Sequence, residues 1–152
     1  MAKNWLVKSE PNVYSIDDLK KDKKTLWDAV RNYQARNFLK SMCVGDRCFI
    51  YHSNAKPPGI AGVAKVSKIN IADPLQFDKK SHYFDEKATK ENPRWFSPEV
   101  KFVKKFKELI SLEQLREEKK LKDMVILRKG NRLSVTEVSD KEFEHILKIA
   151  NT

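Results

Sequence analysis

The sequence predicts an α+β fold, a small curved sheet or barrel with helices at its edges. Two observations predict this class. Segments with the two-residue alternation of strands are mixed with segments of helical spacing, without the regular strand–helix alternation of a doubly wound sheet. Hydrophobic residues make up 40% of the 152 residues, enough for one core. Because linkers, repeats and low-complexity tracts are lacking, one domain is expected over residues 1–152.

The first third of the chain is expected to form one strand and two helices. Residues 5–8 are a short apolar run, and Pro11 ends it. Ser15 can cap a helix, with Asp18 three residues further on, as in a capping box. Asn32 can cap a second helix, whose apolar residues recur at helical spacing.

A hairpin is expected next. Residues 47–53 alternate, so Cys48, Ile50 and His52 should share one face of a strand. Residues 60–71 are rich in isoleucine, valine and alanine and predict a second, long strand. The short Pro-Gly turn between the two segments indicates that they pair.

The second half begins with a long polar segment, residues 73–94, without clear periodicity. A loop of this length in a compact domain is usually functional or mobile. The elements expected after it are a strand at 100–106, a helix from Ser111 to about 119, a strand at 133–138 and a helix from Ser139 to about 149.

The charge balance points to a polyanion as the first partner to consider. Lys and Arg number 31 against 21 Asp and Glu, a formal net charge of +10. The alternative is a solvated, lysine-rich surface that keeps the protein in solution. Two cysteines do not make a disulfide framework, and neither a signal peptide nor a span of about 20 apolar residues is seen. A cytoplasmic monomer without membrane contact is therefore expected, or a nuclear one in a eukaryote.

Catalytic and metal-binding patterns are weak. The sequence has no G-x-S-x-G elbow, P-loop or G-x-G-x-x-G, and its cysteines and histidines lack zinc-ligand spacing. We therefore expect no enzyme activity, no metal and no cofactor. An enzyme that acts on a nucleotide through His52 and Glu10 is kept as the lesser alternative.

Two tryptophans lie beside polar, loop-like sequence. Trp27 and Trp95 are candidate surfaces on which a base could stack, although for a single tryptophan taken alone a core position is the favoured alternative. Trp5, inside the first strand, is assigned to the core. Arg31 and Arg132 lie in dense polar motifs and could meet phosphates, whereas a scattered solvated surface is the alternative.

At these residues the chain resembles the EVE domain family. The resemblance covers nearly the whole chain in order. It is carried by Trp5-Leu6-Val7-Lys8-Ser9-Glu10-Pro11, Tyr14-Ser15-Ile16-Asp17-Asp18-Leu19, Thr25-Leu26-Trp27-Asp28, Val30-Arg31-Asn32-Tyr33-Gln34-Ala35-Arg36-Asn37, Tyr51-His52-Ser53-Asn54, Pro57-Pro58-Gly59-Ile60, Asn92-Pro93-Arg94-Trp95 and Arg132-Leu133-Ser134-Val135. One departure is Ala29, where the family pattern has glycine after Trp-Asp; alanine disfavours positive φ.

The resemblance implies a PUA-like fold, a small mixed β-barrel with flanking helices. It also implies a reader of modified cytosine or adenine in nucleic acid, DNA or RNA. A general RNA-binding module remains the alternative. By similarity to the more distant YTH domains, Trp27 and Trp95 would form an aromatic cage, with polar groups at the base edge and Arg31 and Arg132 at phosphate or sugar. The expected ligand-binding residues are Ser9, Glu10, Trp27, Arg31, Asn32, Tyr33, His52, Ser53, Asn54, Trp95, Arg132 and Ser134.

Overall fold

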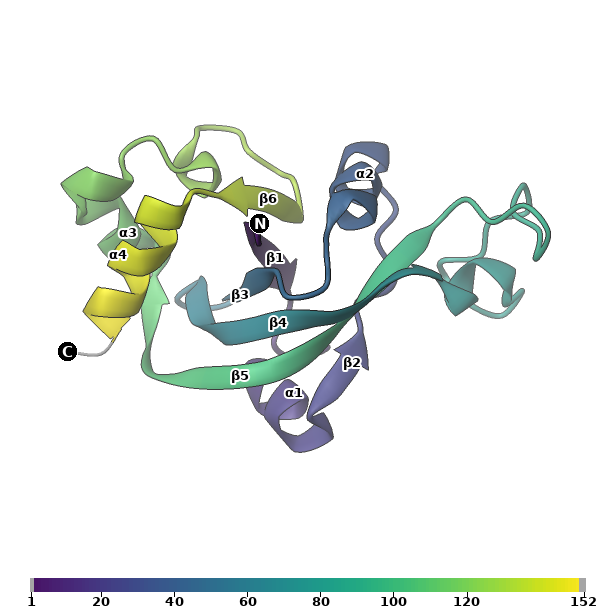
Figure 1. Cartoon of the computed structure of the whole chain (residues 1–152), viewed down its shortest axis with the longest axis horizontal. Helices are drawn as coiled ribbons and strands as arrows, with labels where there is room; N and C mark the ends of the chain where they lie inside the picture. The colour runs from purple at the N-terminus through teal and green to yellow at the C-terminus, as the bar shows by residue number, and fades with distance from the viewer. Residues whose placement is uncertain (1, 151–152) are drawn as a thin grey trace.

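The computed structural model describes residues 2–150 and contains one six-stranded mixed sheet (Figure 1). Its strand order is β2-β5-β4-β3-β1-β6. Among the described residues only β1 and β3 run parallel; the other pairings are antiparallel. The strands are β1 (Asn4–Ser9), β2 (Lys24–Leu26), β3 (Arg47–His52), β4 (Gly59–Ala72), β5 (Phe96–Ser111) and β6 (Val135–Val138).

Within the part of the chain that the structure describes, four α-helices flank the sheet, and this confirms the predicted α+β class. They are α1 (Ile16–Asp22), α2 (Tyr33–Ser41), α3 (Leu112–Glu117) and α4 (Asp140–Ala150), with 3-10 turns η1 (Pro74–Phe77), η2 (Lys119–Leu121) and η3 (Val125–Leu127). Within residues 2–150 no pairing joins the outer strands β2 and β6, so closure into a barrel is not confirmed. Residues 1, 151 and 152 of the predicted single domain lie outside the described residues.

The predicted helix starts are confirmed. The Ser15 and Ser111 side chains each accept a hydrogen bond from the backbone N–H three residues further on. The side chains of those residues, Asp18 and Gln114, accept in turn from the backbone N–H groups of Ser15 and Ser111. Asn32 Oδ1 accepts from the Ala35 N–H at 3.0 Å. Ser139 and Glu142 form the same reciprocal pair at the start of α4. These caps satisfy backbone donors that a helix cannot pair internally.

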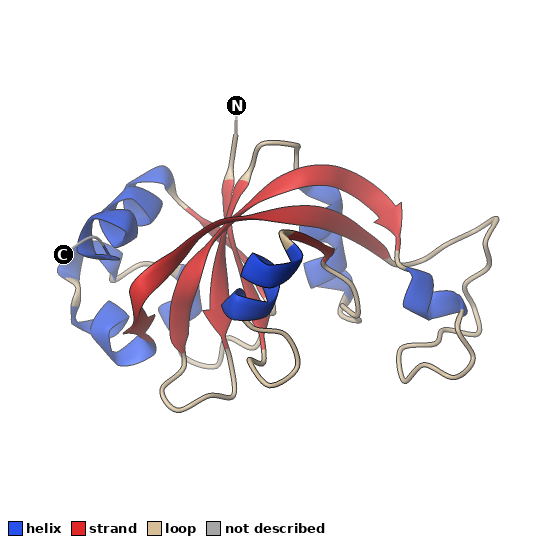
Figure 2. Ribbon diagram, turned by 90° about the horizontal axis from the view of Figure 1, so that it is seen from below, coloured by secondary structure: helices blue, strands red, loops and turns tan. Residues whose placement is uncertain are grey.

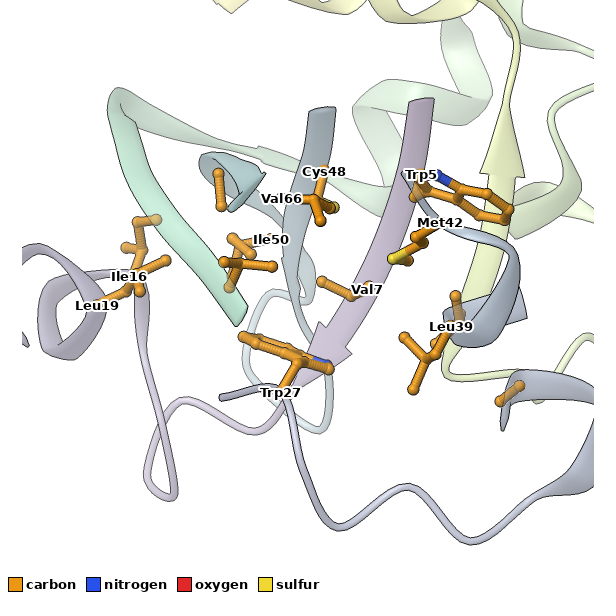
Figure 3. Close-up of a cluster of buried hydrophobic side chains, with 14 of the residues drawn as sticks. Trp5, Val7, Ile16, Leu19, Trp27, Leu39, Met42, Cys48, Ile50 and Val66 are labelled. Atoms are coloured by element: carbon orange, nitrogen blue, oxygen red, sulfur yellow. The ribbon is translucent and has the colours of Figure 1, made fainter. Parts of the chain in front are cut away.

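The sheet has a hydrophobic core on each face. The first core contains Trp5, Ile50 and Trp27 under α1 and α2, and Figure 3 shows its labelled side chains. The second core contains Phe49 and Tyr51 under α3 and α4. The alternation predicted for residues 47–53 is thus confirmed. Trp5 is fully buried, as expected, and its indole N–H donates to buried Asp46 at 2.9 Å.

Strands β4 and β5 form a long hairpin that reaches beyond the rest of the sheet. Figure 2 shows the two strands curving across the molecule with the 73–95 connection at their far end. The sequence predicted only residues 100–106 of β5 and missed β2, which pairs with β5 through three residues. Strand β2 leads directly to Trp27, whose backbone N–H donates to the Pro98 carbonyl at 2.9 Å. This pairing fixes the position of Trp27 against the sheet.

Candidate functional site

Polar side chains gather where the parallel strands β1 and β3 end. We call Ser9, Glu10, His52, Ser53 and Asn54 the strand-end group. Ser9 and His52 are register partners, and the Ser53 N–H donates to the Ser9 carbonyl at 3.0 Å. The Asn54 amide donates to Glu10 at 2.9 Å. All five were predicted as ligand-binding residues, and the structure brings them together.

His52 has a defined tautomer. Its Nε2 accepts a hydrogen bond from the Ile16 N–H at 3.1 Å, so Nε2 carries no proton and Nδ1 does in the neutral ring. Burial lowers the pKa of His52 below its usual value, although Asp17 opposes this effect. The imidazole is therefore neutral near pH 7 and offers one N–H donor.

Trp27 lies on the first-core side of this group. Its indole is 7% exposed and meets the Tyr14 ring edge-on, with centroids 6.5 Å apart. Tyr14 in turn accepts, through its carbonyl, from the Ser9 hydroxyl at 2.6 Å. In Figure 3 the Trp27 ring lies close to Val7 and Ile50. Trp27 therefore joins the strand-end group to the core.

The two residues after Trp27 each have an unusual property, a raised pKa at Asp28 and a positive φ at Ala29. Burial and the nearby Asp73 raise the pKa of the half-buried Asp28 carboxyl. Ala29 has φ of +67°, in the left-handed region where glycine is favoured. The family's glycine thus falls on a position whose backbone requires positive φ, and Ala29 adopts it nonetheless. Its N–H donates to Asp73 at 2.8 Å.

Trp95 belongs to a different assembly, which we call the aromatic–arginine cluster: Arg31, Tyr33, Arg36, Arg94 and Trp95. Tyr33 stacks on Trp95 with centroids 5.1 Å apart, and the Arg31 guanidinium lies 5.1 Å from the Trp95 centroid. Trp95 is 6% exposed, whereas Tyr33 is 50% exposed. The Arg36 guanidinium lies 4.8 Å from the Tyr33 ring centroid, and Arg94 donates to the Tyr33 hydroxyl.

The 73–95 connection is held to this cluster by buried polar groups. Asp73, 1% exposed, accepts from Arg31 at 2.9 Å and from the Ala29 N–H. Gln76 is fully buried; its amide donates to the carbonyls of Asp73 and Trp95 and accepts from the N–H groups of Arg94 and Trp95. The expected long loop is therefore an ordered, internally bonded segment.

Asp85 completes the attachment of the same segment. It accepts from the Trp95 indole N–H at 2.8 Å, and this hydrogen bond is the main cause of its lowered pKa. Arg31 also donates through Nε and Nη2 to the Tyr83 carbonyl, at 3.0 and 2.8 Å. Its guanidinium is thus committed to contacts within the protein.

The remaining predicted residues lie in three places. Asn32 caps α2 with its side-chain oxygen. The Ser134 carbonyl accepts from the Lys8 N–H at 2.9 Å, beside the strand-end group. Arg132 lines a cleft of about 510 Å³, which we call the basic cleft. Its lining residues are Gln34, Phe38, Val125, Arg128, Lys129, Gly130, Asn131, Arg132, Leu133, Thr136 and Glu137.

The structure does not bring the two predicted cage tryptophans into contact. Within residues 2–150 no ring contact joins Trp27 to Trp95. They are linked through Asp73, which binds the Ala29 N–H and donates its own N–H to the Trp95 carbonyl at 2.9 Å. The strand-end group with Trp27 and the cluster with Trp95 are thus two parts of the candidate site joined by one carboxylate.

Sequence reasoning missed Asp73, Gln76, Asp85 and Tyr14. Asp73 before Pro74 carried a usable signal, since Asp followed by Pro is a helix-start pattern, and Asp73 does accept from the Leu75 N–H. Gln76 and Asp85 gave none, because a single polar residue in a polar segment does not reveal its burial.

No group of three or more His, Cys, Asp or Glu within residues 2–150 could hold a metal ion. No helix in the same range is long and apolar enough to cross a membrane.

Comparisons with known proteins give a consistent result. The EVE domain family model matches residues 3–149. Human thymocyte nuclear protein 1 is 39% identical over 168 residues, which cover 98% of this chain and 74% of the relative. A Leishmania major protein of known structure is 44% identical with a TM-score of 0.95, covering 99% of this chain and 96% of that one. Human THYN1 protein, solved in complex with 5-methylcytosine containing DNA, is 38% identical with a TM-score of 0.91, covering 99% of both chains.

Proposed function

We propose that this chain, which belongs to the EVE domain family, binds nucleic acid and reads a modified base, with 5-methylcytosine in DNA as the first ligand to test. One observation carries the proposal: a relative that aligns with 99% of this chain at a TM-score of 0.91 is known in complex with DNA containing that base. The net charge of +10 suits a polyanionic ligand.

The strand-end group supports a base edge as ligand. Neutral His52 offers an N–H donor, and Asn54 with Glu10 offers an amide beside a carboxylate. Trp27 reaches these donors and acceptors through Tyr14, whose ring it meets edge-on and whose carbonyl accepts from the Ser9 hydroxyl. A flipped base costs a few kcal/mol of stacking, and aromatic contact returns roughly 1–3 kcal/mol, so hydrogen bonds must supply the rest.

We propose further that the domain binds without catalysing a reaction, and that its sheet is an open form of the PUA-like barrel. The bonding of the two candidate catalytic groups supports the first point. His52 Nε2 is occupied by the Ile16 N–H, and Glu10 is engaged by Asn54. Mass spectrometry of a modified oligonucleotide after long incubation should show no new product. A product that His52→Ala abolishes would disprove a purely binding role.

The binding function is tested by titrating two DNA oligonucleotides that differ in a single 5-methyl group. The protein should prefer the methylated strand. Trp27→Phe and Trp95→Phe should each reduce that preference, by about 1 kcal/mol or roughly fivefold, because a smaller ring gives less contact. An RNA of the same sequence in a third titration separates the general RNA-binding alternative.

Trp5→Phe is the matched control. It makes the same ring change in the first core, at a tryptophan whose indole bonds Asp46 and takes no part in the site. It should lower stability without changing the preference for the methylated strand. Equal affinity of the wild-type protein for both strands would refute modified-base reading, whatever the variants do.

A further inference from the structure

The basic cleft lies between α2 and the segment that leads into β6. Figure 1 shows α2 beside β6, with the loop that leads into β6 running above that strand. Its volume of about 510 Å³ falls in the range of small-molecule sites, roughly 300–1,000 Å³. This is far more room than one phosphate needs, and it suits a nucleotide.

Three cations on the cleft have no internal partner. Arg128, Lys129 and Arg132 are exposed, and within residues 2–150 no hydrogen bond or ion pair engages their side chains. The acid in the cleft lining, Glu137, forms no ion pair with them in that range. Three cations face a single acid in the lining, so the cleft has a net positive charge.

The turn that carries these cations is preformed. Asn131 donates to the Val125 carbonyl at 2.8 Å and accepts from the Leu133 N–H at 2.9 Å. Gly130, the residue before Asn131, has a φ of +78°, which glycine adopts without strain. Because the backbone is already ordered, binding there costs little additional entropy.

Thr136 is the most buried polar residue among those that line the cleft. It is 1% exposed, and its hydroxyl has no hydrogen-bond partner within the described residues. A buried, unpaired hydroxyl costs free energy that a valine of the same shape would avoid. The hydroxyl itself is closed to solvent, and Thr136 pairs with Leu6 on the second-core face, so this hydroxyl is not a ligand group of the cleft.

The cleft adjoins both parts of the candidate site. Helix α2 presents Tyr33 to the aromatic–arginine cluster, and its next residue, Gln34, lines the cleft with Phe38. On the other side, Ser134 follows the cleft residue Leu133 and bonds Lys8, the neighbour of Ser9. A strand whose base sits at the strand-end group can therefore reach the cleft on one side.

We propose that the basic cleft binds one nucleotide flanking the base that is read, on one side of it only. The inference rests on the proposed function. The phosphate meets Arg128, Lys129 and Arg132, and the sugar and base lie along Phe38 and Gln34. The contact is with the backbone and is independent of the modification.

The test compares Arg128→Gln/Lys129→Gln with Lys120→Gln/Lys148→Gln. Both variants remove two positive charges, but the control pair lines a separate cleft of about 740 Å³ against α4. Single-stranded DNA with a central 5-methylcytosine should lose affinity for the first variant roughly fivefold or more, and for the control much less. The slope of affinity against salt should fall by about two, one per lost contact.

Strand polarity makes the test sharper. Two further oligonucleotides carry the 5-methylcytosine at the 5′ end or at the 3′ end. Removing the flanking nucleotides on one side should abolish the effect of Arg128→Gln/Lys129→Gln, and removing those on the other side should leave it. The proposal would be overturned if Arg128→Gln/Lys129→Gln lost the same affinity for the strand with 5-methylcytosine at the 5′ end as for the strand with it at the 3′ end. An equal loss of affinity in the control variant would overturn it too.

The outcome is separable from that of the proposed function. Preference of the wild-type protein for the methylated strand tests base reading alone. Retained preference with no effect at the basic cleft rejects only the cleft. Gln34→Glu adds a negative charge to the cleft lining and leaves the three cations in place. If this variant also loses the one-sided contribution of the flanking nucleotides to affinity, the result supports the cleft proposal further.

Discussion

The two groups of cations near the candidate site differ in what their charges contact. In the aromatic–arginine cluster, Arg31, Arg36 and Arg94 bond carbonyls, carboxylates and aromatic faces of the protein. In the basic cleft, Arg128, Lys129 and Arg132 contact no such group within residues 2–150. A partnered, part-buried guanidinium stabilises the fold and would lose its bonds on meeting a phosphate. An unpartnered exposed one can bind a phosphate by releasing counterions only.

The comparison explains why similar residue types should respond differently to mutation. Arg31 and Arg132 both lie in motifs of the matched family, and both were expected to meet phosphate or sugar. The structure gives Arg31 an ion pair with Asp73, whose side chain is 1% exposed. It leaves Arg132 exposed on a cleft. Stability should therefore depend on the first, and salt-dependent binding on the second.

The largest effect is expected for Gln76→Leu. The substitution removes four hydrogen bonds of a fully buried amide. It leaves the N–H groups of Arg94 and Trp95 without a partner, while the carbonyls of Asp73 and Trp95 each keep a backbone donor. Each unsatisfied group costs about 1–3 kcal/mol, so a loss of about 3 kcal/mol or more in the free energy of unfolding is expected. Urea denaturation measures it. Exposed Lys79→Ala on the same segment should stay within about 0.5 kcal/mol of wild type; a similar small loss for Gln76→Leu would show that the segment does not depend on this amide.

The next largest effect on stability is expected for Arg31→Gln, and the same substitution at Arg132 should affect binding instead. Arg31→Gln should lower the free energy of unfolding by about 2 kcal/mol, because a charged hydrogen bond to buried Asp73 is lost. Arg132→Gln should leave stability within about 0.5 kcal/mol of wild type while reducing the salt slope of oligonucleotide binding by about one. Denaturation and salt titration of both variants check the pair. The reverse pattern would mean that Arg132 stabilises the fold and that Arg31 binds a phosphate.

The smallest stability effect is expected for Thr136→Val. The hydroxyl has no partner in the described residues, so its replacement by a methyl group should be neutral or slightly stabilising, within about 0.5 kcal/mol. Affinity for the oligonucleotide should stay close to that of the wild type, because the hydroxyl is closed to solvent and does not face the cleft. Thermal melting and binding titration are both needed. A clear loss of stability would show that the hydroxyl has a structural partner.

Much of this site could be predicted from the sequence, for a physical reason. A helix cap such as Asn32 depends on groups within four residues, and strand alternation at 47–53 depends on a two-residue period. The strand-end residues could be predicted because the matched family motifs fall where the predicted strands end and loops begin. Each of these signals is local, so no knowledge of the rest of the chain is needed.

Tertiary structure decided which of these residues are free to act. The Arg31–Asp73 ion pair joins residues 42 positions apart, and Arg36 bonds the Arg94 carbonyl across 58 positions. No local pattern reports such contacts. The sequence by itself determined the α+β class, the helix starts, the family and a basic protein with polar strand ends. The tertiary structure decided the parallel pairing of β1 with β3, the separation of Trp27 from Trp95, and which cations remain unpaired, because each of these depends on where distant segments meet.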